Sequence, residues 1–223
     1  MSLKVQVVPV TPYQQNCSII QCQASGLAAI VDPGGDIERI EAAISQMDAR
    51  VEKILLTHGH LDHCAAADVL RQKLTVPMEG PEQGDSFWID KLPEWCEMAG
   101  FPKAEPFTPD RWLEHGDTVT VGEQTLEVIH CPGHTPGHVS IHIRSGGQEA
   151  LITGDCIHHP CQMSRTDWCS SADADQAQGR RTREDLLARY ADGDVLVIGT
   201  HFATPTAGRV RTRAAGGYWL DVD

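Results

Sequence analysis

The sequence contains no apolar run that approaches the roughly 20 residues that a helix needs to cross a bilayer. Leu27–Val31, one of the longest such runs, has five residues. Residues Met1–Lys4 are not followed by the hydrophobic stretch that a secretion signal requires. We therefore expect a soluble protein that has no membrane partner, is not exported and works in the cytoplasm.

An excess of positive charge is also missing. The chain has 18 Lys and Arg residues against 31 Asp and Glu residues, a net charge of −13. Because such a field repels phosphate backbones, we expect no nucleic acid partner. The eight cysteines, with no signal peptide before them, are expected to stay reduced. No low-complexity linker or repeat interrupts the chain, which favours one domain over residues 1–223.

The hydrophobic pattern predicts strands mixed with helices. The first three strands are expected to form a meander, and the turn after them ends at Asp36, which is expected to cap a helix that reaches Met47. Helical segments are predicted over Ala65–Leu74 and Asp173–Tyr190, and a helical or irregular insertion over Glu82–Ala99. Strands are predicted over Lys4–Val10, Ser18–Cys22, Leu27–Val31, Val51–Thr57, Val76–Gly80, Val119–Val121, Gln124–His130, His138–Ile143, Ala150–Thr153 and Val195–Ile198.

The segment T-H-G-H-L-D-H at 57–63 places three imidazoles and a carboxylate between a predicted strand and a predicted helix. A small loop cannot bury and satisfy so many polar groups, whereas one or two borderline cations would use all of them. The alternative is a polar loop that is merely solvated. We expect His58 and His60 to face one metal, and Asp62 and His63 to face a second.

Three more candidate ligands, His134, Asp155 and His201, come shortly after predicted strands. Each one alone is more often a capping or hydrogen-bonding residue. Together they complete two sites, because His134 joins the first metal, His201 joins the second and Asp155 bridges the pair. His138 is expected to orient the loop around His134. The predicted metal ligands are His58, His60, Asp62, His63, His134, Asp155 and His201.

The H-x-H-x-D-H signature followed by these residues resembles the metallo-β-lactamase superfamily. The resemblance implies an α/β fold, a four-layer αββα sandwich with two mixed sheets face to face and a dinuclear site at one edge. It also implies a hydrolase in which a metal-bridging hydroxide attacks an activated acyl or phosphoryl bond. Asp62 and Asp155 are the predicted catalytic residues, and Asp62 would orient the nucleophile or accept its proton.

Residues 1–154 resemble the small bacterial glyoxalase II enzymes, the hydroxyacylglutathione hydrolases. The similar segments are P-V-T-P-Y-Q-Q-N-C-S at 9–18, V-D-P-G-G-D at 31–36, L-L-T-H-G-H-L-D-H at 55–63 and H-C-P-G-H-T-P-G-H at 130–138. This resemblance implies hydrolysis of a glutathione thioester of the S-lactoylglutathione type. Arg165 or Arg180 would then supply the cationic contacts to glutathione.

Residues 155–223 resemble a different branch, the methyl parathion hydrolases and related lactonases. C-I-H-H-P-C-Q-M at 156–163 and G-T-H-F-A-T-P-T-A-G at 199–208 carry this second resemblance. Natural divergence, recombination or engineering would each produce such a junction. The second resemblance implies a lactone, aryl ester or phosphotriester as substrate.

Several alternatives therefore remain open. His158, His159, Trp168 and Phe202 are expected to line a substrate pocket, although the two aromatic residues are equally compatible with the core. The imidazole and carboxylate ligands suit two divalent ions, with Zn expected and Fe, Mn or Co compatible. The partner is a small-molecule ester, thioester, lactone or phosphotriester, and no oligomeric state is indicated. A non-catalytic metal-binding module is the remaining alternative, although structural zinc sites are usually closed by four ligands.

Overall fold

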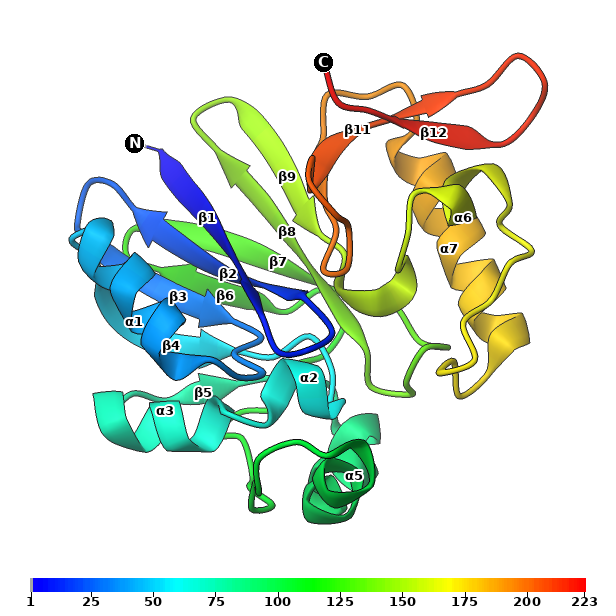
Figure 1. Cartoon of the computed structure of the whole chain (residues 1–223). Coiled ribbons are helices and arrows are strands. Elements are labelled where there is room, and N and C mark those ends of the chain that lie inside the picture. Colours follow the sequence, from blue (N-terminus) through cyan, green and yellow to red (C-terminus); the bar gives the residue numbers. More distant parts are fainter. Residues whose placement is uncertain (1) are drawn as a thin grey trace.

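Two mixed β-sheets lie face to face in a computed structural model of the chain, which describes residues 2–223 (Figure 1). The first sheet has the strand order β1-β2-β3-β4-β5 and contains β1 (Leu3–Val10), β2 (Gln15–Cys22), β3 (Leu27–Val31), β4 (Arg50–Leu55) and β5 (Met78–Glu79). The second has the order β12-β11-β10-β9-β8-β7-β6 and contains β6 (Thr118–Val121), β7 (Gln124–His130), β8 (Val139–Ser145), β9 (Gln148–Ile152), β10 (Leu196–Ile198), β11 (Ala207–Thr212) and β12 (Tyr218–Asp221).

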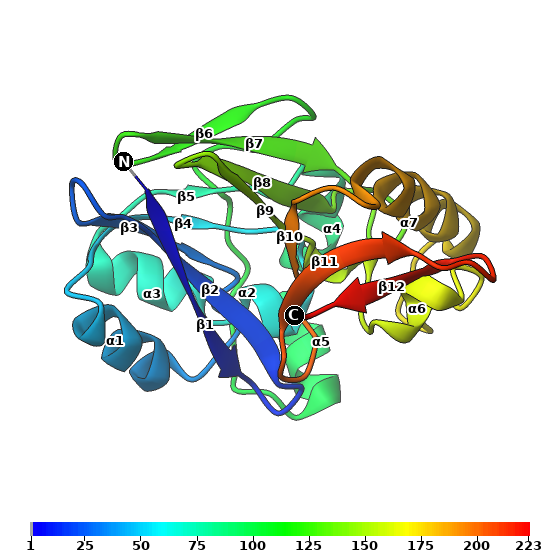
Figure 2. The same ribbon diagram turned by 90° about the horizontal axis from the view of Figure 1, so that it is seen from above.

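Helices cover the outer faces of the sheets. In Figure 2, α1 and α3 lie on the side of the first sheet away from β6 and β7, and α7 lies beside the second sheet. None of the helices described in residues 2–223 has the length and hydrophobicity that a membrane span requires. The helical segments are α1 (Ile37–Gln46), α2 (Leu61–Cys64), α3 (Ala67–Leu74), η1 (Gln83–Asp85), α4 (Ser86–Asp90), α5 (Leu92–Ala99), η2 (Gly154–Cys156), α6 (Cys161–Ser164) and α7 (Gln176–Tyr190).

The layers follow from the alternation of side chains along the strands. Neighbouring residues of a strand point to opposite faces, so Ile19 packs with α1 and α3 whereas Ile20 packs between the sheets. In the second sheet Ile152 faces the first sheet, and Leu151 packs against Leu187 of α7. Three buried apolar clusters thus separate four layers, and the predicted αββα sandwich is confirmed.

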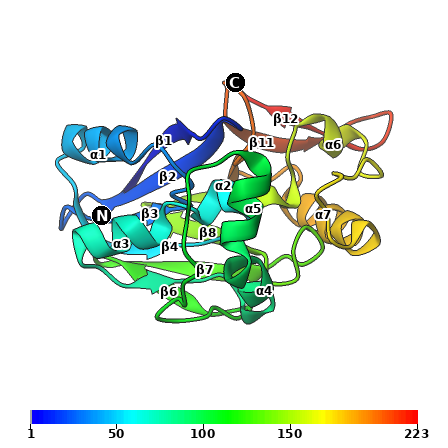
Figure 3. The same cartoon turned by 60° about the horizontal axis from the view of Figure 1, so that its bottom comes forward.

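Several strands end at one edge of the sandwich. β9 and β10 are parallel, and β7 runs in the same direction because β8 is antiparallel to both β7 and β9. Residues that follow β4 in the first sheet lie at the same edge, because Thr57 O accepts a hydrogen bond of 2.8 Å from Val139 N at the start of β8. Figure 3 turns α2 and α5, which lie at this edge, toward the viewer. Residues that follow these strands are therefore brought together.

The predicted meander of β1, β2 and β3 is confirmed, but other expectations were wrong. The helix expected over Ala65–Leu74 corresponds to α3, which begins two residues later at Ala67, and a short helix that was not predicted, α2, precedes it and begins directly after His60. Asp36 precedes α1 but makes no side-chain cap, since its φ is 48° and its Oδ2 accepts from Thr11 N instead.

The C-terminal part contains further differences from the predicted elements. The hairpin of β11 and β12 was not predicted, because its strands are short and carry several charged residues. α7 begins at Gln176 rather than at Asp173, since the side chain of Asp175 caps it by accepting from Gln178 N at 2.9 Å. Asp173 is thereby left outside the helix.

Gly199 lies between β10 and His201, and a Cβ there would come within 2.2 Å of the Phe202 ring. We expect Gly199→Ala to lower the free energy of unfolding by about 1–3 kcal/mol, because the buried ring would have to move. Chemical denaturation in the presence of a chelator would measure this. Gly193→Ala is the matched control, since its Cβ would meet only Tyr190 O at 3.5 Å. Equal stability of the two variants would contradict the prediction.

Candidate metal centre

The first ligand group comes from the turn between β4 and α2. His58 and His60 follow β4, and His60 sits at the N-terminal boundary of α2 in an extended conformation. Asp62 and His63 lie in the first turn of α2. Because the backbone changes from extended to helical within this segment, His58 and His60 point in a different direction from Asp62 and His63.

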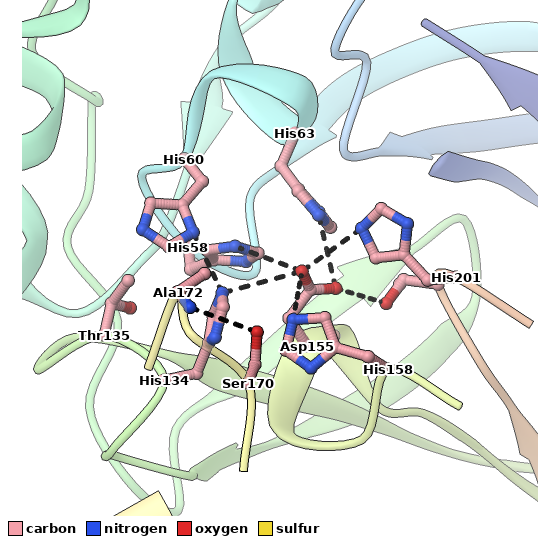
Figure 4. A network of polar contacts seen from close by, with 12 residues as sticks. His58, His60, His63, His134, Thr135, Asp155, His158, Ser170, Ala172 and His201 are labelled. Carbon is pink, nitrogen blue, oxygen red and sulfur yellow. Dashed lines mark hydrogen bonds and ion pairs between the residues drawn. The ribbon is translucent and has the colours of Figure 1, made fainter. Parts of the chain in front are cut away.

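The other candidates approach from the second sheet. His134 follows β7, Asp155 lies in η2 directly after β9, and His201 follows β10. Figure 4 shows the imidazoles converging on Asp155. The structure thus brings together all seven side chains that were predicted as ligands, with the donor atoms in each group within 4.8 Å of one another. The groups of predicted ligands are His58, His60 and His134; Asp62, His63 and His201; and His58, His63 and Asp155. A fourth group joins His134 to His158 and Asp173.

Asp155 lies between the first two groups. Its Oδ2 is 3.5 Å from His134 Nε2 and 3.2 Å from His201 Nε2. Its Oδ1 is 3.3 Å from His63 Nε2. In the first group, His60 Nδ1 and His134 Nε2 are 2.9 Å apart, and in the second His201 Nε2 is 3.2 Å from Asp62 Oδ2. These spacings suit two neighbouring ions with one shared carboxylate.

The donor set fits divalent metals. His58 Nε2 and His63 Nε2 are buried and have no hydrogen-bond partner, although both point toward Asp155. A buried nitrogen without a partner costs about 1–3 kcal/mol. Bound metal ions would satisfy both nitrogens, and imidazole and carboxylate ligands suit Zn, Fe, Mn and Co.

The electrostatics of the two groups differ. Burial lowers the pKa of His58 well below its usual value and, together with His134, lowers the pKa of His60 to about 3. Burial also acts on His201, but the Asp155 and Asp62 carboxylates outweigh it and raise the pKa to about 9. The first group is therefore neutral and ready to bind a cation, whereas the second would release protons when a cation binds.

Two hydrogen bonds position Asp155, one through its carboxylate and one through its backbone. Thr200 Oγ1 donates to Asp155 Oδ1 at 2.7 Å, and the Asp155 backbone N–H donates to His138 Nε2 at 2.8 Å. Gly154 is required there, because a Cβ would lie 2.3 Å from His138 Nε2. His138 therefore orients the turn that carries Asp155, in addition to its expected place beside the His134 loop.

Of the four predicted substrate contacts, His158 lies closest to the cluster. Its Nε2 is 3.3 Å from Asp155 Oδ2, and its ring stacks on that of His201 with centroids 5.8 Å apart. His159 is exposed, and its Nδ1 accepts from Cys161 N at the start of α6. The contacts of His159 are thus with its own turn.

The two aromatic candidates differ in exposure. Phe202 is 2% exposed and packs among apolar residues between β10 and α7, so it belongs to the core rather than to a substrate pocket. Trp168 is 50% exposed, with the Arg165 guanidinium 5.1 Å from its ring, so it is not a core residue.

The sequence analysis missed three buried carboxylates around the ligands. Asp32 accepts from Thr57 N and Thr57 Oγ1, and its Oδ2 is 3.0 Å from His63 Nδ1. It directly follows β3, which is parallel to β4, so the same strand-end argument that found His58 would have found it. Asp173 Oδ1 lies 2.9 Å from His134 Nδ1.

Asp85 joins two ligand loops. It accepts from Gly59 N at 2.7 Å, Gly137 N at 2.6 Å and Thr135 Oγ1 at 2.7 Å. Burial raises its pKa to about 6, and the hydrogen bonds that it accepts oppose that rise. No local pattern in the insertion of residues 82–99 indicated this role, because its partners are distant in sequence.

Comparison with known proteins shows the family to which this sequence is similar. The sequence pattern of the Metallo-beta-lactamase superfamily matches residues 10–201. Hydroxyacylglutathione hydrolase GloC of Haemophilus influenzae is 35% identical over 208 residues, which cover 93% of this chain and 94% of the relative.

Two solved structures have the same fold. TTHA1623 in a di-iron-bound form has a TM-score of 0.73 at 24% identity, covering 92% of this chain and 94% of its own. The dizinc quorum-quenching lactonase AidC has a TM-score of 0.69 at 17% identity, covering 94% of this chain and 79% of its own.

We expect Zn²⁺ to raise the unfolding temperature of the chelator-treated protein, because the ions would satisfy the buried nitrogens of His58 and His63. At a free concentration 100-fold above the dissociation constant, each site would add about 2.7 kcal/mol. Thermal unfolding with and without Zn²⁺ measures this. Mg²⁺ at the same concentration is the control, since it prefers oxygen ligands. An unchanged unfolding temperature with Zn²⁺ would contradict the metal centre.

Proposed function

The chain belongs to the metallo-beta-lactamase superfamily, and from that membership we propose that this dinuclear metallo-hydrolase cleaves a thioester of the hydroxyacylglutathione type. The observation that carries the proposal is the 35% identity to a hydroxyacylglutathione hydrolase, which extends over 94% of that relative. Because the ligand groups come from both the first and the last parts of the chain, we treat residues 1–223 as one hydrolase domain.

In this proposal His58, His60 and His134 hold one ion, Asp62, His63 and His201 hold the other, and Asp155 is shared. When bound, two divalent ions supply Lewis acidity, which polarises a scissile carbonyl and lowers the pKa of a nearby water molecule. We infer no preference for Zn over Fe from this donor set.

The two carboxylates have separate roles. His63 and His201 outweigh burial and keep the pKa of Asp62 below its usual value, so this carboxylate is ionised and accepts a hydrogen bond from the attacking water. Asp155 is ionised for the same reason, and Thr200 holds it in place. Attack of the water oxygen on the carbonyl carbon forms a C–O bond, Asp62 accepts the proton that the water loses, and the C–S bond breaks as a thiolate leaves. The thiol released has a pKa near 8.5, so it leaves without a protein acid.

The pairing of two arginines in the last third of the chain favours a second substrate class, which carries no glutathione. Arg165 is exposed and pairs with Asp167 at 2.9 Å, and Arg180 pairs with Glu184 at 2.8 Å. Each guanidinium thus already has a carboxylate partner within this chain, which the carboxylates of glutathione would have to displace or share. His158 lies within the cluster instead, where its imidazole can contact a neutral substrate. A lactone, aryl ester or phosphotriester is therefore the alternative.

We expect His58→Ala and Asp155→Ala to lower hydrolysis by roughly three orders of magnitude or more, since several kcal/mol of transition-state stabilisation would be lost. Initial rates and metal content, measured on the same preparations, test this. His115→Ala is the matched control, because His115 is exposed and its Nδ1 accepts only from His130 N. Parental turnover by either ligand variant would refute the proposed centre.

Initial rates on a lactoylglutathione thioester, an acyl homoserine lactone and an aryl phosphotriester decide between the substrate classes. One metal-reconstituted preparation and a chelated control should be used for all three. We expect the highest kcat/KM for the thioester, with full loss of activity in the chelated control. If the lactone or phosphotriester is preferred, the proposal of a thioesterase is wrong and the C-terminal segments set specificity.

A further inference from the structure

The loop that carries His134 is built onto a segment from the last third of the chain. Ala174 N donates to His134 O at 2.9 Å, and Asp175 N donates to Gly133 O at 2.9 Å. Gly133 has a φ of 127°, and a Cβ there would lie 2.2 Å from Gly179 N in α7. Thr182 Oγ1, one turn further along α7, donates to the carbonyl of residue 132 at 2.6 Å.

Asp173 adds a side-chain contact to this backbone interface. Its Oδ1 is 2.9 Å from His134 Nδ1, and its Oδ2 accepts from Ser170 N at 3.0 Å. Figure 4 shows Ser170 and Ala172, the neighbours of Asp173, beside the His134 ring.

The contact determines which nitrogen of His134 carries the proton. A carboxylate can only accept, so His134 Nδ1 must donate, and in the neutral ring Nε2 then has a free lone pair. That Nε2 is the atom that faces His60 Nδ1 and Asp155 Oδ2. The same arrangement holds for His63, whose Nδ1 lies 3.0 Å from Asp32 Oδ2.

We propose that Asp173 is a positioning residue, which fixes the tautomer and ring orientation of His134 for the ion held by His58, His60 and His134. Hydrogen bonds of this kind from ligand histidines to carboxylates typically change metal affinity by about 10- to 100-fold. Residues 170–182 therefore hold the loop that carries His134, whereas the two other histidines of the same ion, His58 and His60, come from residues 58–60. This inference rests on the metal centre proposed above.

Zn²⁺ titration of chelator-stripped protein against a competing chromophoric chelator tests the proposal. We expect Asp173→Ala to bind one of two Zn²⁺ ions about 10- to 100-fold more weakly and the other with parental affinity. Asp175→Asn is the matched control, because Asn still caps α7 and residue 175 does not contact the His134 ring. Parental affinity for both ions in Asp173→Ala would overturn the inference.

A second variant identifies the affected half of the centre. His60→Ala removes a ligand of the first ion, so in that background Asp173→Ala should leave the remaining Zn²⁺ affinity unchanged. A further loss of affinity in the double variant would assign Asp173 to the other half and overturn the proposal. Unfolding curves recorded in chelator show whether each variant is folded before Zn²⁺ is added.

Nitrogen NMR of the unsubstituted, metal-free protein provides a readout that does not depend on any variant. We expect the His134 ring to carry its proton on Nδ1, and a proton on Nε2 would overturn the inference. A parent chain that binds no Zn²⁺ would overturn both the centre and this inference. A parent chain that binds two Zn²⁺ ions but hydrolyses no substrate would count only against the proposed function.

Discussion

The burial of several imidazoles and carboxylates at the seam between two sheets is the constraint on which the rest of the structure depends. His58 and His63 are fully buried, and Asp155 between them is 3% exposed. An apolar interior would make such groups costly unless each had a partner. Hydrogen bonds to Asp155 satisfy part of this need, and two of the buried nitrogens that remain unpaired, His58 Nε2 and His63 Nε2, are in position to bind a pair of cations.

Three further buried carboxylates, Asp32, Asp85 and Asp173, hold the segments that carry the candidate ligands. Asp32 joins β3 to the chain after β4, Asp85 joins the loop at Gly59 to the loop around Thr135, and Asp173 joins His134 to the segment before α7. Each one connects elements that are far apart in the sequence. The ligand side chains are therefore held by the packing of both sheets and of α7. Loss of any of these contacts would change the position of a ligand side chain.

The hydrophobic pattern was sufficient to predict the bounds of strands that are long or almost fully buried. β3, a continuous apolar run, and β7 have the bounds predicted from the sequence, because their side chains enter two different apolar layers. It failed where tertiary contacts override local preference. Asp36 bonds to Thr11 instead of capping α1, and the charged strand β11 is stabilised by pairing with β10 and β12.

The sequence by itself predicted a candidate metal-binding cluster, because three imidazoles and a carboxylate within one short turn have few other uses, and its resemblance to a known superfamily predicted the sandwich that the structure shows. Only the tertiary structure decided how those residues are held. The partners of His63, His134 and Gly59 are carboxylates that lie between 26 and 39 residues away along the chain. The position of Asp32 at a strand end is visible in the sequence, but the pairing of each carboxylate with its partner depends on how separate elements pack.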